Sequence, residues 1–134
     1  MNQNGFELEM AVRDYECDMQ GVVNNAVYQN YLEHARHEYL KSIGIDFAKF
    51  AAQGVNLVVT RIEIDYKLSL TSGDRFIVEV EAERISPLRF GFRQSIRRLP
   101  DRKLSVSALV TGTALNAKGR PYLPQELEVF PGRT

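Results

Sequence analysis

The feature that most constrains the fold is a change of hydrophobic period near Gly54. Before it, apolar residues recur at the i, i+3, i+4, i+7 spacing of one face of an α-helix. After it, apolar and polar residues alternate with the twofold period of a β-strand. The chain therefore predicts one long helix followed by a run of strands. The apolar helical positions are Tyr28, Tyr31, Leu32, Ala35, Tyr39 and Ile43.

The long helix has recognisable ends. Asn24 or Asn25 suits its N-cap, and Gly44 suits the residue that follows its last turn. Residues 46–53 add one or two further helical turns. The face of the long helix opposite the apolar stripe is polar, and it carries Gln29, Glu33, Arg36, His37 and Lys41.

Five segments are predicted as strands. Residues 6–13 alternate loosely, and four longer segments follow Gly54 with turns between them at 71–74, 86–87 and 100–101. Because such short connections join antiparallel neighbours, we predict a meander in which each of the four pairs with the next. Strands this long twist strongly and can curl around the single helix. The residues thus predict an α+β domain with one helix laid across an antiparallel sheet.

Composition narrows the function. A length of 134 residues suits one domain spanning 1–134. The 17 basic and 17 acidic residues give no net charge, which argues against charge-driven binding to nucleic acid or anionic membranes. No stretch approaches a membrane span, and the single cysteine excludes an intrachain disulfide, so we expect a cytoplasmic protein. The open sheet edges favour self-association across a twofold axis.

Asp18 stands a few residues before the helix and admits two interpretations. A helix N-terminus presents unpaired amide donors and a partial positive charge, which can hold a carbonyl oxygen that becomes an anion. Asp18 would then attack the carbonyl or activate a water, and Gly21 would let the backbone approach the ligand. Alternatively, Asp18 only stabilises a turn or the helix start. The spacing alone leaves both open.

The run Asp18-x-x-Gly21-x-Val23, with the helical positions that follow it, resembles a known family signature. The family is the 4-hydroxybenzoyl-coenzyme A thioesterase family of hot-dog-fold acyl-CoA thioesterases, and the likeness covers essentially the whole chain. It implies a hot-dog fold, in which a curved antiparallel sheet of about five strands wraps one long helix. The helical positions of the signature are Tyr28, Tyr31, Glu33, Ala35 and Arg36.

The resemblance also implies an activity and an assembly. It implies hydrolysis of an acyl-CoA to a carboxylic acid and free coenzyme A, with no metal and no cofactor beyond the substrate. It implies a homodimer, often paired into a homotetramer, with the active site at the subunit interface. Asp18 is then the catalytic carboxylate, as nucleophile or as general base. The substrate-binding residues expected around it are Gly21, Asn24, Asn25, Ala26 and Tyr28. The resemblance implies that the backbone amide of Asn25 holds the thioester oxygen, with its neighbours Asn24 and Ala26 as further candidates.

Some positions depart from related patterns. Asn25 stands where a subset of the family carries histidine, and an amide side chain cannot act as acid or base. The same run also resembles acyl-carrier-protein thioesterases, but Gln20 and Val22 replace the asparagine and histidine of those enzymes. Two alternatives therefore accompany the acyl-CoA interpretation. One is an acyl-carrier-protein thioesterase, and the other is a non-catalytic acyl-thioester binding protein on the same fold.

Arginines recur on one face of the third long strand, at Arg89, Arg93 and Arg97. One interpretation is a cross-strand charge ladder, with Glu83 opposite Arg89 and Glu79 opposite Arg93. The other is that Arg89 and Arg93 bind the phosphates of coenzyme A, for which the geometry of arginine is well suited. The sequence does not choose between them.

Overall fold

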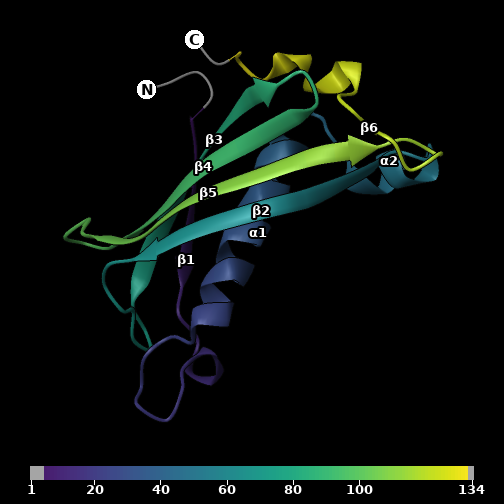
Figure 1. Cartoon of the computed structure of the whole chain (residues 1–134). Helices are drawn as coiled ribbons and strands as arrows, with labels where there is room; N and C mark the ends of the chain where they lie inside the picture. Colours follow the sequence, from purple (N-terminus) through teal and green to yellow (C-terminus); the bar gives the residue numbers. More distant parts are fainter. Residues whose placement is uncertain (1–4, 133–134) are drawn as a thin grey trace.

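The computed structural model describes residues 5–132, which form one sheet and two α-helices (Figure 1). None of the helices formed by these residues is long and apolar enough to cross a membrane. Two short 3₁₀ turns complete the structure, at Asp14–Glu16 and Gln125–Val129. The helices are α1 (Asn25–Ser42) and α2 (Phe47–Ala52). The strands are β1 (Gly5–Ala11), β2 (Asn56–Tyr66), β3 (Arg75–Ser86), β4 (Arg89–Arg98), β5 (Leu104–Leu115) and β6 (Pro121–Tyr122).

The sheet is antiparallel throughout, in the order β1-β3-β4-β5-β2, with β6 paired to β5. The predicted meander is correct for β3, β4 and β5 but wrong for β2, which pairs with β5 instead of β3. The reason is that β2 ends at Tyr66, and residues 67–74 form a link that passes the start of α1. There, the Val23 N–H donates to the Leu70 carbonyl oxygen at 2.9 Å, and the Leu70 N–H donates to the Tyr28 hydroxyl at 2.8 Å.

The predicted register of the β3–β4 hairpin is also wrong. A register shift near the turn places Glu83 opposite Gly91 and Glu81 opposite Arg93. The charge ladder itself is present, but its ion pairs are diagonal: the Arg93 Nε lies 3.3 Å from the Glu83 Oε1. A bulge at the hairpin end thus shifts the pairing without removing the favourable cross-strand charges.

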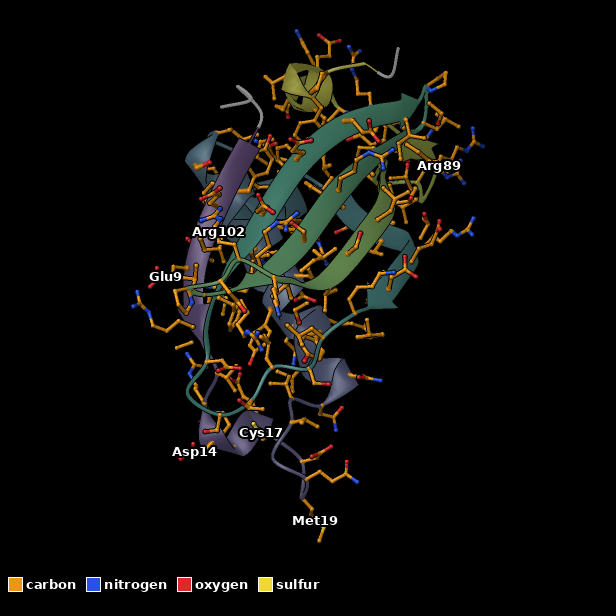
Figure 2. The ribbon with its side chains drawn as sticks, turned by 90° about the vertical axis from the view of Figure 1, so that its left-hand side faces the viewer. Glu9, Asp14, Cys17, Met19, Arg89 and Arg102 are labelled. Carbon is orange, nitrogen blue, oxygen red and sulfur yellow. The ribbon has the colours of Figure 1, made fainter. Side chains whose placement is uncertain are left out.

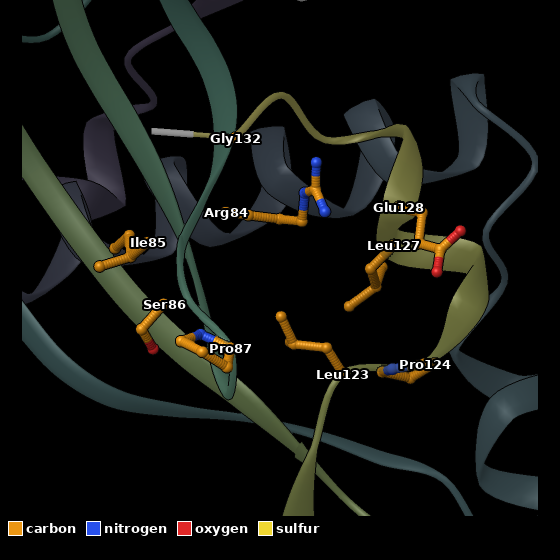
Figure 3. Close-up of a pocket in the computed structure, with 9 residues that line it drawn as sticks. All are labelled: Arg84, Ile85, Ser86, Pro87, Leu123, Pro124, Leu127, Glu128 and Gly132. Atoms are coloured by element: carbon orange, nitrogen blue, oxygen red, sulfur yellow. The ribbon is translucent and has the colours of Figure 1, made fainter. Parts of the chain in front are cut away.

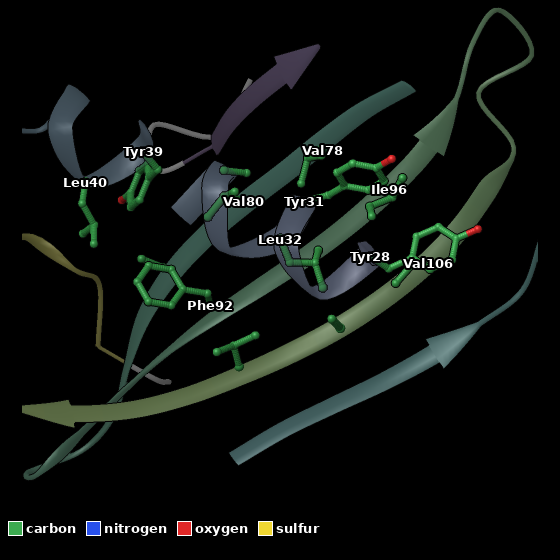
Figure 4. Packing of buried hydrophobic residues seen from close by; sticks show 14 of the residues in the cluster. Tyr28, Tyr31, Leu32, Tyr39, Leu40, Val78, Val80, Phe92, Ile96 and Val106 are labelled. Atoms are coloured by element: carbon green, nitrogen blue, oxygen red, sulfur yellow. The ribbon is translucent and has the colours of Figure 1, made fainter. Parts of the chain in front are cut away.

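The core lies between α1 and the inner face of the sheet (Figure 4). Most of the predicted apolar stripe of α1 packs there, with Tyr28, Tyr31, Leu32 and Ala35 all at most 2% exposed. The prediction is wrong for Ile43, which follows the last helical residue and is 38% exposed. Phe130 from the C-terminal segment is also buried, and its ring meets those of the core residues Tyr39, Phe90 and Phe92.

Arg36 is an exception to the predicted helix faces. The helical spacing predicts it on the polar face, yet only 7% of the residue is exposed. The Arg36 Nη1 donates to the Gln94 Oε1 at 3.1 Å, and the Gln94 Nε2 donates to the Leu32 carbonyl oxygen at 3.0 Å. Arg36 lies four residues from both Leu32 and Leu40, which are buried, so it shares their face of the helix. A polar pair therefore lies inside the helix–sheet interface.

Candidate active site

Asp18 lies in a tight turn just before α1. Cys17 and Val23 form an isolated antiparallel bridge, and the Asp18 N–H donates to the Val22 carbonyl oxygen at 2.9 Å. Gly21 has a φ of +82°, in the left-handed region that glycine adopts without strain. The sharp turn expected at Gly21 is present, while its contact with a ligand stays a prediction.

The two oxygens of the Asp18 carboxylate have different surroundings. Oδ1 accepts hydrogen bonds from the Gln20 N–H at 2.8 Å and the Val22 N–H at 3.4 Å. Oδ2 accepts no hydrogen bond from residues 5–132, and the residue is exposed. Asp18 therefore stabilises its turn through one oxygen, as the structural interpretation requires, and leaves the other open. The catalytic interpretation of Asp18 stays a prediction.

The start of α1 presents fewer free amides than the sequence suggested. Asn24 is the N-cap, and its Oδ1 accepts a hydrogen bond from the Ala26 N–H at 3.0 Å. The Asn24 N–H donates to the Glu16 carbonyl oxygen at 3.3 Å. Of the three amides predicted to hold a thioester oxygen, only that of Asn25 has no acceptor within the described part of the chain. The helix start thus offers the Asn25 N–H as the free donor among these three.

A side-chain bond fixes the segment before Asp18 to α1. The Tyr31 hydroxyl donates to the Glu16 Oε1 at 2.8 Å. Burial, and then the Glu16 carboxylate, raise the pKa of Tyr31 well above its ordinary value. This contact joins residues 15 positions apart, and no spacing rule in the sequence indicated it. It holds the chain that leads into the Asp18 turn against the helix.

A small cavity of about 130 Å³ opens beside the helix start. Asn25 and Tyr28 line it from α1, and Tyr66 lines it from the end of β2 together with residues 67–69. The Tyr28 and Tyr66 rings lie 5.7 Å apart, and Tyr66 is 44% exposed. No motif in the sequence indicated that Tyr66 lines a cavity here. Tyr66 is the last residue of an edge strand, and this place follows only from the strand order, which the sequence did not predict for β2. Asp18 does not line the cavity.

The arginines predicted to bind coenzyme A lie elsewhere. Figure 2 shows Arg89 at the opposite end of the molecule from Cys17 and Met19, which flank Asp18. Arg93 points from the outer face of the sheet, where it pairs with Glu83. Within one chain, the structure does not bring either arginine together with Asp18.

A larger cavity, of about 430 Å³, lies where the C-terminal segment meets the end of β3 (Figure 3). Arg84 lines it, and its Nε donates to the Phe130 carbonyl oxygen at 2.9 Å. The Arg84 N–H also donates to the Pro131 carbonyl oxygen at 2.7 Å. These bonds fasten the C-terminal segment to the sheet. None of the predicted site residues lines this cavity.

Comparison with known proteins decides the family, because the model of the thioesterase-like superfamily matches residues 12–130. The chain belongs to the thioesterase-like superfamily. This match covers the Asp18 turn, α1 and every long strand after it. The predicted thioesterase family and hot-dog fold are confirmed at the level of this superfamily.

Comparisons with individual proteins give more detail. The chain is 43% identical over 118 residues to the chloroplastic acyl-acyl carrier protein thioesterase ATL2 of Arabidopsis thaliana, covering 87% of this chain and 63% of that one. It is 26% identical to the long-chain acyl-CoA thioesterase FadM of Escherichia coli, covering 92% and 93%. The crystal structure of Slr0204, a 1,4-dihydroxy-2-naphthoyl-CoA thioesterase from Synechocystis, superposes with a TM-score of 0.86 at 22% identity, covering 93% of both chains. The similarity to Slr0204 shows that the two chains share a fold.

Proposed function

We propose that this protein is an acyl-CoA thioesterase. The superfamily match over residues 12–130 carries this proposal, because it includes both Asp18 and the start of α1. Similarity to FadM, named as a long-chain acyl-CoA thioesterase, supports coenzyme A as the thiol component of the substrate. The chain spans less than two thirds of ATL2, so the reaction is inferred from this shared part.

The proposed mechanism uses the free groups at the helix start. The thioester oxygen accepts a hydrogen bond from the Asn25 N–H, and the positive end of α1 stabilises the negative charge that develops there. The Asp18 carboxylate then either attacks the carbonyl carbon or removes a proton from an attacking water. In the first case the C–S bond breaks, the thiolate of coenzyme A leaves, and water cleaves the resulting anhydride. The reaction requires water and substrate alone.

A second candidate is hydrolysis of acyl carrier protein thioesters. ATL2, named as an acyl-acyl carrier protein thioesterase, favours it, because 43% identity covers most of this chain. Val22 argues against it, since it lacks the imidazole of the histidine expected of that class, whereas Gln20 keeps the amide group of the expected asparagine on a longer side chain. Both candidates share the same reaction at the carbonyl carbon, and they differ in the surface that recognises the thiol component.

Matched substrates separate the two candidates. We expect hydrolysis of acyl-CoA esters with a higher kcat/KM than that of the same acyl groups on acyl carrier protein. The measurement is a release assay for free thiol over short, long and aromatic acyl groups in both forms. A higher kcat/KM for the acyl carrier protein thioesters would contradict the acyl-CoA proposal and support the second candidate. Turnover of neither form would favour a non-catalytic acyl-thioester binding protein.

We further propose a homodimer formed along β2, with pairing of dimers into a tetramer as the larger alternative. β2 is an edge strand of 11 residues, and its ladder is unpaired on one side within the described chain. Val59, Ile62 and Tyr66 are 48%, 39% and 44% exposed along it. A partner at this edge would cover these side chains and enclose the cavity beside Asn25. A cytoplasmic location, in keeping with the single cysteine, completes the proposal.

A substitution that introduces a charge at the β2 edge tests the proposed dimer. Ile62→Asp is expected to give a monomer with turnover at least about tenfold lower, because an ionised group would be buried between subunits. Mass in solution by light scattering and hydrolysis of acyl-CoA are the measurements. Glu63→Gln, on the opposite face of the same strand, is the control and should leave both unchanged. A wild-type monomer with full turnover would contradict the proposal.

A further inference from the structure

A cavity of about 200 Å³ lies between α1, α2 and the beginning of β2, away from the helix start. Its walls are mainly apolar, and three polar side chains of α1 also line it: exposed Glu33, half-buried His37 and buried Arg36. The His37 ring packs against the Phe47 ring at 4.5 Å. The apolar walls include Leu40, Phe47, Leu57, Phe90 and Phe92. The cavity thus combines an apolar interior with one buried cation.

Arg36 is short of acceptors in this position. A guanidinium carries five N–H donors, and Arg36 makes one hydrogen bond, from its Nη1 to Gln94. No carboxylate of residues 5–132 lies within ion-pair distance of Arg36. Since the residue is 7% exposed and lines the cavity, the cavity is where its remaining donors can meet an acceptor. A buried cation is costly unless it is paired, so an anion in the cavity would be stabilised.

The cavity and the candidate active site lie along the same pair of elements. Both cavities lie between α1 and β2, one at Asn25 and Tyr66, the other at Arg36 and Val59. Ile62 lies between them on β2, and it faces α1 because its partner in the ladder, Val110, is buried in the core. Eleven residues of helix separate Asn25 from Arg36, which is about 17 Å along the axis. Between the two cavities, β2 therefore presents an apolar side chain toward the helix.

We propose that this cavity binds the distal end of the acyl group, and that Arg36 selects acyl groups ending in a carboxylate. The inference rests on the proposed function, because the acyl group would extend along α1 and β2 from a thioester held at Asn25. The apolar walls take the chain, and the planar guanidinium offers a carboxylate the N–H groups that Gln94 leaves free. Glu33 lies at the exposed side, and its carboxylate attracts the Arg36 guanidinium from beyond ion-pair distance, so a bound carboxylate must compete with it.

Binding in the absence of turnover tests this selection. The protein carrying Asp18→Asn is titrated calorimetrically with pairs of acyl-CoA esters of equal length, one ending in a carboxylate and one in a methyl group. Lengths run from short to long. We expect the carboxylate member to bind at least about tenfold more tightly at the best length, as for a hydrogen bond to a charged group. Adding Arg36→Met should abolish that preference, and Arg36→Lys should retain part of it.

The outcomes separate this inference from the proposed function. Equal or tighter binding of the methyl member at every length overturns the selection by Arg36, even if the enzyme hydrolyses both. A carboxylate preference in a protein without hydrolysis supports the cavity and overturns the thioesterase proposal. If Arg36→Met fails to fold, Leu57→Trp fills the cavity from β2 and leaves Arg36 in place. That variant should lose at least about tenfold in affinity for the carboxylate member, and unchanged affinity overturns the inference.

Discussion

Asp18→Asn is expected to lower kcat for acyl-CoA hydrolysis by about 10²- to 10⁴-fold. Asparagine keeps the shape of the side chain, and its oxygen can still accept hydrogen bonds from the Gln20 and Val22 amides. It lacks the negative charge, so it can neither attack a carbonyl nor take a proton from water. Steady-state release of coenzyme A measures the loss, and the KM of the variant should stay within a few-fold of wild type.

Asp46→Asn is the matched control for this substitution. Asp46 Oδ1 accepts a hydrogen bond from the Ala48 N–H at 2.8 Å, two residues on, just as Asp18 Oδ1 accepts one from the Gln20 N–H at 2.8 Å. Both aspartates are exposed and stabilise local backbone. Asp46→Asn should therefore leave kcat unchanged. Equal losses in the two variants, or a kcat near wild type for Asp18→Asn, would refute a catalytic role for Asp18.

Hydrophobic periodicity and turn residues predict the helices and strands of this fold, but they do not predict which strands pair. The helical and twofold spacings locate α1 and the three strands that form the meander, because each depends on local alternation around one core. The place of β2 depends on the link 67–74, which passes the helix start and is fixed there by Tyr28 and Leu70. Such long-range hydrogen bonds produce no periodic pattern in the sequence. Arg36 shows a second limit, since a polar residue at a buried helical position is recognised only when Gln94 faces it.

In the candidate site, too, local features are predictable from the sequence and long-range contacts are not. The cap at Asn24 and the turn at Gly21 follow from residue type, and the structure contains both. The sequence did not indicate that the Ala26 amide is taken by the Asn24 cap, or that the Asn24 amide binds the Glu16 carbonyl oxygen. Those bonds depend on the path of the loop before the helix. Only the folded chain narrows the predicted donors to Asn25.

Three buried tyrosines predict a steep loss of stability in alkali. Tyr28, Tyr31 and Tyr39 are 2%, 2% and 5% exposed, and burial raises the pKa of each. Below pH of about 10 all three are protonated in both states, so their contribution to stability is complete. Above it, the unfolded chain releases protons that the folded chain keeps, and stability falls until the pH passes the raised pKa values.

The expected slope is about 4 kcal/mol of unfolding free energy per pH unit, from about 1.4 kcal/mol for each tyrosine. Urea denaturation at a series of pH values above about 10 measures it. Because a domain of this size is stable by about 5–15 kcal/mol, such a slope removes a large share of its stability over the pH range in which the unfolded chain ionises and the folded chain stays protonated. A free energy that stays constant across this range would contradict the assignment of these tyrosines as protonated and buried.

Tyr39→Phe isolates one of the three protons. The Tyr28 hydroxyl accepts the Leu70 N–H and the Tyr31 hydroxyl donates to Glu16, whereas the Tyr39 hydroxyl makes no hydrogen bond with the described residues. Tyr39→Phe should therefore change the stability at neutral pH by less than about 1 kcal/mol and reduce the alkaline slope to about 3 kcal/mol per pH unit. Tyr15→Phe is the control, because Tyr15 is 78% exposed and its phenol meets water in both states. An equal reduction of the slope in both variants would show that burial is not its cause.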